Sequence, residues 1–345
     1  MKKVSVITPC YNAADCLEIY MEKLSLQSVG MDALEIIMVN DCSTDDTLTK
    51  LQEIESRYPE SVMLIPLEKN VRQGAARNIA LQYATADYIL FLDADDTLHP
   101  KAVEKLLKKA REDDADVVQF LSKDTFETGY IENETKSGKR DLCVTIDNDE
   151  KRRMFVMSDA VVYGCWNKLY KRSIITDNSL KFAEGVLLEE PLLTFPLYFY
   201  IRKFSMLNEY LYNYYQNPKG TCRNLFYDEE HMYDNVKVQY ELLLDLEKRG
   251  LLEKYHDEIG ARIADCYYYQ SVSNLFAIDR PLDLSVLNSM AETMRTYFPD
   301  IRHNPYLNTY PVMRDNLDML FTTLTEDNIK EYAGRWKEIN QSKEI

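Results

Sequence analysis

The sequence predicts an α/β domain with a mostly parallel sheet covered by helices on both faces, followed by a mostly helical region. Two observations carry this prediction. Short apolar runs alternate with segments of helical spacing from Val4 to Glu112. The runs are apolar at nearly every position, which is typical of strands buried on both faces of a parallel sheet.

The first part of the chain contains four such runs and four helical segments in alternation. We expect parallel strands at VSVITP (4–9), LEIIMVN (34–40), VMLIPL (62–67) and DYILFL (87–92). Helices are expected over residues 13–28, 43–58, 74–84 and 99–112. Ser43 is the expected N-cap of the second helix, because aspartates and then an apolar stripe follow it.

The rest of the chain is less regular. DVVQFLS (116–122) predicts another strand, residues 123–149 a hairpin or a loose insertion, and apolar patterning returns in 154–175 and 189–204. From about Tyr227 onward the spacing is helical. We therefore expect a first domain over residues 1–224 and a helical region over 225–345, with QNPKGTCRN (216–224) between them.

Composition excludes several classes of protein. The net charge is −16 and the pI is near 4.8, which argues against a protein that coats nucleic acid. Seven scattered cysteines without a Cys-x-x-Cys pair predict reduced thiols in a cytoplasmic protein. The N-terminal apolar run is too short for a signal peptide, and no later run is long enough to span a bilayer.

Polar residues collect where the predicted strands end. Pro9 to Asn12 follow the first strand, Asn40 and Asp41 end and follow the second, and the acidic segment 93–96 follows the fourth. In an open parallel sheet, ligands bind at the carboxyl ends of the strands. Each cluster alone fits an ordinary turn or helix cap as well, but three on one edge favour a binding site.

Asp93 and Asp95 point to a divalent cation. Two positions apart in an extended segment, both carboxylates lie on one side. Mg²⁺ and Mn²⁺ use one or two protein carboxylates and complete their shell with phosphate oxygens and water. Because neither GxxxxGK[ST] nor GxGxxG occurs, we expect a metal ion to hold a diphosphate at this edge.

These segments resemble a known family. VSVITPCYN, IIMVNDCSTDDT, NVRQGAARNIAL and YILFLDADDTLHP, followed by WNKLYKRS and GVLLEEPLLT, are similar in kind and order to the family 2 glycosyltransferases of the GT-A fold. The resemblance implies a Rossmann-like α/β domain and a nucleotide-diphosphate sugar as donor, usually a UDP-sugar. It covers roughly the first 110 residues well and leaves the C-terminal helical part without a motif.

The resemblance also implies roles for residues at the strand ends. Pro9 and Tyr11 would line the base, and Asp41, next to Asn40, would contact the uracil or ribose. Two departures leave the identity of the base open, because Asn40 stands where many relatives have aspartate and Cys42 where glycine is common.

Further roles concern the sugar and the metal. Arg77 and Asn78 would lie near the sugar nucleotide; the alternative is a salt bridge and a hydrogen bond that only brace the strand edge. Asp93 and Asp95 would form the Asp-x-Asp motif around Ala94, at the sugar nucleotide, with Asp95 the direct ligand of Mn²⁺ or Mg²⁺.

The acidic pair Glu189–Glu190 is implicated in catalysis by the same resemblance. Relatives commonly have Glu-Asp here, and the second acid takes the proton of the acceptor hydroxyl in an inverting transfer. Glu190 would be this base and Glu189 would orient it. Without the resemblance, two acids before Pro191 fit a helix start, where they favour the helix dipole.

The acceptor side is less defined. Trp166 and Lys168 are candidate acceptor contacts, with a core aromatic as the alternative reading of Trp166. Lys219 and Arg223 fit either a lid over the diphosphate or an interdomain linker, and His231 fits either a third metal ligand or a surface residue.

The expected acceptor is a saccharide or lipid-linked molecule of a bacterial surface polysaccharide. Trp336 among lysines fits either a peripheral contact with the inner face of the membrane or a solvated terminal helix. The oligomeric state stays open.

Two rival functions remain. DADDTL fits the pattern of haloacid-dehalogenase-like phosphatases, in which Asp93 would be phosphorylated, but that motif normally follows the first strand of the chain. A degenerate transferase that only binds a sugar nucleotide is the second rival, motivated by Cys42 and Glu190.

Overall fold

The computed structural model describes residues 2–131, 135–218, 220, 231, 233–276, 281–310, 314 and 316–341, with side chains as far as Arg335. The chain divides into two compact units. The first comprises Met1–Phe155 and Asp159–Asn224, and the second comprises Val156–Ser158 and Leu225–Ile345.

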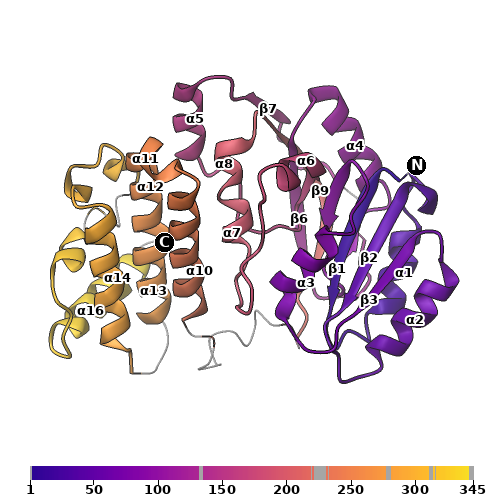
Figure 1. Ribbon diagram of the computed structural model, residues 1–345, viewed down its shortest axis with the longest axis horizontal. Helices are drawn as coiled ribbons and strands as arrows, with labels where there is room; N and C mark the ends of the chain where they lie inside the picture. The colour runs from indigo at the N-terminus through magenta and orange to yellow at the C-terminus, as the bar shows by residue number, and fades with distance from the viewer. Residues whose placement is uncertain are drawn as a thin grey trace. The chain divides into compact units, whose positions relative to one another are not determined.

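A mixed sheet forms the centre of the first unit (Figure 1). Its strands within the described ranges are β1 Val4–Cys10, β2 Leu34–Asn40, β3 Val62–Pro66, β4 Tyr88–Phe91, β5 Thr97–Leu98, β6 Val117–Thr125, β7 Leu142–Thr145, β8 Lys168–Lys171 and β9 Lys203–Tyr215. They lie in the order β3-β2-β1-β4-β8-β6-β9-β5, and β7 pairs with β9 outside this path.

The parallel part of the sheet is confirmed. β1 pairs in parallel with β2 and β4, and β2 with β3, because each connection between these strands includes a crossover helix. β8 runs antiparallel to both β4 and β6, whereas β6 and β9 are again parallel. The strand predicted at 116–122 is β6, and the segment 123–149 contributes the edge strand β7.

The helices between residues 17 and 200 are α1 Leu17–Ser25, α2 Thr47–Arg57, α3 Arg72–Leu81, α4 Ala102–Asp113, α5 Asp149–Val156, α6 Arg172–Thr176, α7 Pro191–Thr194 and α8 Leu197–Tyr200. The predicted cap of the second helix is wrong. α2 begins at Thr47, and the Ser43 hydroxyl instead accepts a hydrogen bond from the backbone N–H of Asn12 at 3.1 Å. Pro191 occupies the first turn of α7, as expected.

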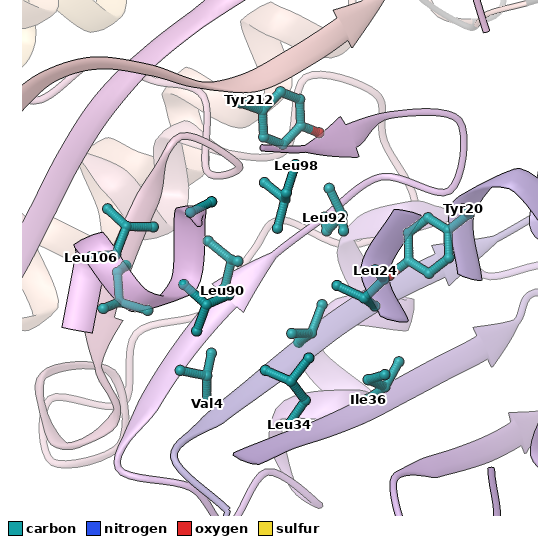
Figure 2. Close-up of a cluster of buried hydrophobic side chains, with 14 of the residues drawn as sticks. Val4, Tyr20, Leu24, Leu34, Ile36, Leu90, Leu92, Leu98, Leu106 and Tyr212 are labelled. Atoms are coloured by element: carbon teal, nitrogen blue, oxygen red, sulfur yellow. The ribbon is translucent and has the colours of Figure 1, made fainter. Parts of the chain in front are cut away.

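One face of the sheet carries a large apolar core (Figure 2). Strand residues that alternate toward this face pack against α1, α2 and α4. Members of the cluster include Val4, Leu34, Ile36, Leu90, Tyr20, Leu24, Leu51, Leu106 and Tyr212. On the other face, α3 packs against β1 and β2, and Phe91 meets Phe182 edge-on with ring centroids 5.1 Å apart. Cover on both faces explains why the first strands are apolar throughout.

The second unit is helical, as predicted for the C-terminal region. Its helices are α10 Asp234–Lys248, α11 Leu251–Lys254, α12 His256–Ile263, α13 Ser271–Phe276, α14 Leu284–Tyr297 and α16 Asn328–Gln341, with a π-helical segment at Ala264–Gln270. Figure 1 shows α10, α12, α13 and α14 beside one another. Within the described residues, no helix is both long and apolar enough to cross a bilayer.

Candidate active site

Three strand ends bring the predicted residues to one edge of the sheet. Cys10 at the end of β1 is in register with Asn40 at the end of β2, and Ile7 is in register with Phe91 at the end of β4. Tyr11 follows β1 and is 52% exposed, so its ring is free to stack on a planar ligand. Pro9 is only partly exposed within β1.

Asp41 organises the loop that enters α3. Its carboxylate accepts a hydrogen bond from the backbone N–H of Val71 at 2.7 Å, and its backbone oxygen accepts one from Asn70 at 3.1 Å. Burial raises the pKa of Asp41, although hydrogen bonds from the backbone N–H groups of Val71 and Arg72 oppose the rise. Next to it, Asn40 is buried, and its side-chain oxygen has no hydrogen-bond partner within the described part of the chain.

Several residues at this edge have left-handed backbone conformations. The φ angles of Asn12, Cys42, Arg72 and Leu188 are +50°, +55°, +68° and +60°. A non-glycine residue is strained there, and such strain clusters at functional sites. The conformation of Cys42 gives a physical reason why glycine is common at this position in the family that the motif resembles.

The three aspartates after β4 separate into different roles. Asp96 is buried and accepts hydrogen bonds from the hydroxyl of Tyr212 at 2.5 Å and the backbone N–H of Tyr215 at 2.7 Å. It therefore ties β9 to the site. Asp93 and Asp95 stay partly exposed, so their carboxylates are available to a ligand.

Neighbours on both sides hold Asp93 and Asp95. Arg77 lies 2.7 Å from Oδ1 of Asp93, and Asn217 donates to Oδ2 of Asp95 at 2.9 Å. Ala94 between them is buried in the apolar cluster, so its side chain packs inward.

The charges of these carboxylates fit a divalent cation. Burial and the charge of Asp93 raise the pKa of Asp95, and the charges of Asp95 and Asp93 add to burial in raising the pKa of Asp96. Such crowding of like charges favours a bound cation. Within the described residues, no group of three or more His, Cys, Asp or Glu side chains is arranged to hold a metal. Two carboxylates, with water and phosphate completing the shell, suit Mg²⁺ or Mn²⁺.

Arg77 joins the aspartates to the acidic pair. It is 4% exposed, and its guanidinium forms ion pairs with Glu189 and, as given above, with Asp93. The guanidinium also lies over the ring of Phe182 at 5.3 Å from the centroid. This is the bracing arrangement considered for Arg77, and contact with a sugar nucleotide remains a prediction.

α3 also holds the segment that leads to the acidic pair. Asn78 donates to the backbone oxygen of Phe182 at 3.0 Å and to Glu184 at 2.9 Å, and it accepts from the backbone N–H of Phe182 at 2.9 Å. Gln73 donates to Oε2 of Glu189 at 2.9 Å. A Cβ at Gly74 would lie 2.1 Å from the backbone oxygen of Ala183, so only glycine permits this approach.

Glu190 lies in a setting that favours its protonated form. Burial, followed by the charge of Glu189, raises the pKa of Glu190 to about 8, while Arg77 and the backbone N–H of Cys165 oppose the rise. Glu189 is 2% exposed and is held by Arg77 and Gln73. A carboxylate whose pKa lies near neutrality is suited to exchange a proton with a substrate.

The candidate acceptor contacts lie in different surroundings. Trp166 is partly exposed and stacks on Tyr214, with centroids 5.5 Å apart and planes at 21°. Lys168 is fully buried and donates to the backbone oxygen of Gly164 at 2.5 Å and to Asn167 at 2.8 Å. Its ammonium is therefore turned to the protein, and a contact with an acceptor has no support from this geometry.

Other candidates are placed as follows. His231 belongs to the second unit and is buried, with Nδ1 at 2.9 Å from Asp234, so the surface reading is wrong. Lys219 and Arg223 lie outside the described residues, and the side chain of Trp336 does too.

Sequence reasoning missed several residues at the site. Gln73 and Gly74 lay in the segment that resembles the family but drew no notice, although a glycine inside a helical pattern is a signal of close approach. Asn217 lay in the segment interpreted as a lid or linker. Cys165 adjoins Trp166 in the sequence. It acts on Glu190 through its backbone N–H, which the identity of its side chain does not reveal.

The comparisons with known proteins agree with this geometry. The family model described as glycosyl transferase family 2 matches residues 5–178, half of the chain. The uncharacterized glycosyltransferase YibD of Escherichia coli K12 is 32% identical over 222 residues, which cover 64% of this chain and 63% of YibD. The poly(ribitol-phosphate) β-N-acetylglucosaminyltransferase TarS of Staphylococcus aureus is 25% identical over 286 residues, which cover 82% of this chain and 47% of TarS. The chain thus spans less than two thirds of either relative.

A solved structure matches the fold. The crystal structure of residues 1–349 of S. aureus TarS in complex with UDP-GlcNAc superposes with a TM-score of 0.70 at 21% identity, covering 95% of this chain and 92% of that one. At this identity the match shows the fold alone, which is the GT-A arrangement. Together with the match over residues 5–178, it shows that the chain belongs to glycosyl transferase family 2.

Proposed function

We propose that this glycosyltransferase moves a sugar from a UDP-sugar to a hydroxyl group with inversion, with the help of a divalent cation. The observation that carries the proposal is the guanidinium of Arg77, which links Asp93 of the Asp-x-Asp segment to Glu189 of the acidic pair. The buried guanidinium of Arg77 thus fixes the distance between the Asp-x-Asp segment, which is expected to bind the metal and the donor, and the acidic pair, which is expected to supply the base.

The donor is assigned from the strand ends. Tyr11 offers an exposed ring for a base. The side-chain oxygen of the buried Asn40, which finds no hydrogen-bond partner among the described residues, could accept from an N–H of uracil. UDP-N-acetylglucosamine is the first donor to test, because the TarS structure that shares the fold holds it.

The proposed chemistry assigns one role to Glu190 and another to the pair Asp93 and Asp95. Glu190 would accept the proton of the acceptor hydroxyl while that oxygen attacks the anomeric carbon from the face opposite the diphosphate. Asp93 and Asp95 would hold Mn²⁺ or Mg²⁺. When bound, such a cation supplies positive charge that stabilises a departing diphosphate.

The acceptor is proposed more broadly. TarS and the poly(ribitol-phosphate) β-glucosyltransferase of Bacillus spizizenii carry names that specify a polyol-phosphate acceptor. A saccharide, polyol-phosphate or lipid-linked hydroxyl of a cell-surface polymer is therefore the acceptor class for this chain. Cytoplasmic location and contact with the membrane remain predictions.

The test measures thermal unfolding with UDP, with and without Mn²⁺. A ligand that binds the folded state alone stabilises it by about 2.7 kcal/mol at a hundredfold excess over Kd. We expect UDP to raise the Tm only when Mn²⁺ is present. Asp95→Ala should remove most of this rise and leave the unliganded protein folded.

Glu53→Gln is the matched control, because Glu53 is an exposed acid on α2, away from the strand ends. It should respond to UDP as the wild type does. Equal stabilisation by UDP in EDTA would contradict the role of the metal. A phosphorylated Asp93 found by mass spectrometry after incubation with phosphate esters would instead support the phosphatase alternative.

A further inference from the structure

The chain at the end of β9 holds the Asp-x-Asp segment by hydrogen bonds. The backbone N–H of Tyr215 donates to Oδ1 of Asp96 at 2.7 Å, and the side-chain amide of Asn217 donates to Oδ2 of Asp95 at 2.9 Å. The backbone N–H of Asn217 also donates to the backbone oxygen of Tyr215 at 2.7 Å, which closes a three-residue turn. Two consecutive aspartates are therefore bonded from one short piece of backbone.

This end of β9 is itself anchored. The hydroxyl of Tyr212 donates to Oδ2 of Asp96 at 2.5 Å. The backbone N–H of Gln216 donates at 2.8 Å to the backbone oxygen of Thr125, the last residue of β6. Asn217 follows directly after these contacts, so the sheet determines where its amide lies.

The two expected metal ligands each use one carboxylate oxygen inside the protein. Oδ1 of Asp93 pairs with Arg77 at 2.7 Å, and Oδ2 of Asp95 accepts from Asn217. Both aspartates are partly exposed, so a ligand can reach them. Within the described part of the chain, each aspartate is thus oriented by a partner on one oxygen and keeps the other oxygen, Oδ2 of Asp93 and Oδ1 of Asp95, for a ligand.

We infer that Asn217 is a positioning residue for the metal: it holds Oδ2 of Asp95 so that Oδ1 alone is left for the cation, which favours Mg²⁺ and Mn²⁺ over Ca²⁺. The inference rests on the proposed function, because it takes Asp95 to be a direct ligand of the metal. It also gives a role to a residue that the sequence placed in a lid or a linker.

The physical reason lies in what each cation demands. Mg²⁺ requires near-ideal octahedral geometry, whereas Ca²⁺ accepts about six to eight oxygens and carboxylates that bind through one or both of theirs. Mn²⁺ is likewise suited to an octahedron of oxygens. A carboxylate with one oxygen hydrogen-bonded keeps its orientation and does not turn both oxygens to one ion. Loss of such a partner typically lowers metal affinity by about 10–100-fold.

The test measures the Kd of UDP by calorimetry over a series of Mn²⁺ concentrations and finds the midpoint, the Mn²⁺ concentration that gives half of the maximal affinity. The complex of Mn²⁺ with UDP in solution is the same for every variant, so it does not affect the comparison. We expect the midpoint to rise about tenfold in Asn217→Ala, which removes the donor to Asp95. Asn217→Ser, whose side chain is one atom shorter, should behave in the same way, whereas Asn217→Gln keeps an amide and should lie closer to wild type.

The same titration with Ca²⁺ separates orientation of Asp95 from general damage to the site. Damage would weaken the binding of both cations alike. Loss of the Asn217 amide instead lets both oxygens of Asp95 turn to the larger ion, so the Ca²⁺ midpoint should rise by less than about threefold. The preference for Mn²⁺ over Ca²⁺ should therefore fall in Asn217→Ala.

Asn148→Ala is the matched control, because the amide of Asn148 also donates to an aspartate, Oδ1 of Asp147 at 3.2 Å. It follows β7, which pairs with the opposite end of β9 at Lys203. The side-chain oxygen of Asn148 accepts from the backbone of α5, so its loss should lower the Tm. The midpoints for both cations should stay within twofold of wild type.

Three results would overturn the inference about Asn217. They are an unchanged Mn²⁺ midpoint in Asn217→Ala, a lower midpoint, which would mean that the amide competes with the cation for Asp95, and a preference for Mn²⁺ over Ca²⁺ as strong as that of wild type. Each of these leaves the proposed function intact. If the wild type itself shows no metal-dependent binding of UDP, the proposed role of the metal fails and the inference fails with it.

Discussion

At the scale of single residues, the charge of one buried arginine is set against the charges of four acids at the site. Asp93 and Glu189 pair with Arg77, whereas Asp95 and Glu190 have raised pKa values that burial causes. The sequence places these acids correctly at one edge, because strand ends of a parallel sheet meet there. It cannot separate their roles, because burial and pairing with Arg77 depend on contacts between residues distant in the chain.

The raised pKa of Glu190 predicts a pH-dependent gain in stability for Glu190→Gln. The folded pKa lies above the unfolded one, so the folded state holds its proton to higher pH than the unfolded state does. Burying Glu190 is neutral below the unfolded pKa and costs stability as the pH rises from about 4.5 to about 8. Denaturation in urea without metal should show Glu190→Gln gaining on the order of 4 kcal/mol over wild type at pH 8 and almost nothing at pH 4.

Glu189→Gln is the matched contrast and should act in the opposite direction. Its carboxylate is buried against Arg77, and removal of one partner from a buried ion pair typically costs about 3–5 kcal/mol. We therefore expect Glu189→Gln to destabilise the protein at pH 7. Equal effects of the two substitutions would contradict the different surroundings that we describe for them.

Glu190→Gln also tests the base itself. General-base catalysis typically contributes about 10²–10⁴-fold, so sugar transfer should fall by that factor while Mn²⁺-dependent UDP binding is retained. Release of UDP by slow hydrolysis of the donor serves as the assay where no acceptor is known, because water too must lose a proton. Transfer by Glu190→Gln at the wild-type rate would mean that Glu190 is not the base and only precedes the first turn of α7.

The strained backbone at Cys42 gives a prediction about a departure from the family pattern. With φ at +55°, a residue that carries a Cβ is disfavoured by about 1–2 kcal/mol relative to its right-handed conformation. Cys42→Gly should therefore be more stable than Cys42→Ala by about 1 kcal/mol, although glycine loses more entropy on folding. The two variants share the loss of the thiol, so their difference in urea midpoint isolates the backbone. A more stable alanine variant would show that the strain is relieved locally.

At the scale of elements, α3 is the helix on which the site depends. Gly74, Arg77 and Asn78 all lie on it and hold the segment 182–189. The helix itself is predicted from the sequence to within two residues at its start. The sequence does not predict the position of residues 182–189, the segment that α3 holds. These residues form neither helix nor strand, and their position follows from contacts with α3.

Gly74→Ala should disturb this contact. The new Cβ would lie 2.1 Å from the backbone oxygen of Ala183 and 2.9 Å from Cγ of Glu189, so α3 or the segment that carries the acidic pair must move. We expect a loss of stability of about 1–3 kcal/mol and UDP release reduced at least tenfold, since small displacements of catalytic groups lower rates strongly.

Gly334→Ala provides the control for Gly74→Ala. Gly334 lies in α16, and a Cβ there would meet no atom within 4 Å. The same substitution should therefore stabilise by up to about 1 kcal/mol through helix propensity, without change in activity. If Gly334→Ala lowered UDP release as much as Gly74→Ala does, the loss in Gly74→Ala could not be attributed to the close approach between Gly74 and Ala183.

At the scale of the whole molecule, the sequence predicts one half of the sheet better than the other. β1 to β4 follow from alternation of apolar runs and helices, since crossover connections make the strands parallel. β8 and β9 pair across long stretches of chain, as in Leu90 with Leu169 and Val117 with Phe204. Such pairing depends on which edges remain free once the first strands have assembled, and no local pattern records it.

The site residues described here all belong to the first unit, which gives a prediction for the chain cut after Asn224. Asp41, Asp93, Asp95 and Glu190 lie within residues 1–224, and the division between the two compact units falls at this point. We expect residues 1–224 to fold and to bind UDP in the presence of Mn²⁺ with a Kd within threefold of the full chain, measured by calorimetry. The Tm should be lower, because the buried Val156, which clusters with the second unit, loses its apolar neighbours there. Asp95→Ala in the shortened chain should abolish the binding, which controls for weak association of the nucleotide elsewhere. A folded fragment without metal-dependent binding would mean that residues beyond 224 complete the donor site, and the assignment of the site to the first unit would then be wrong.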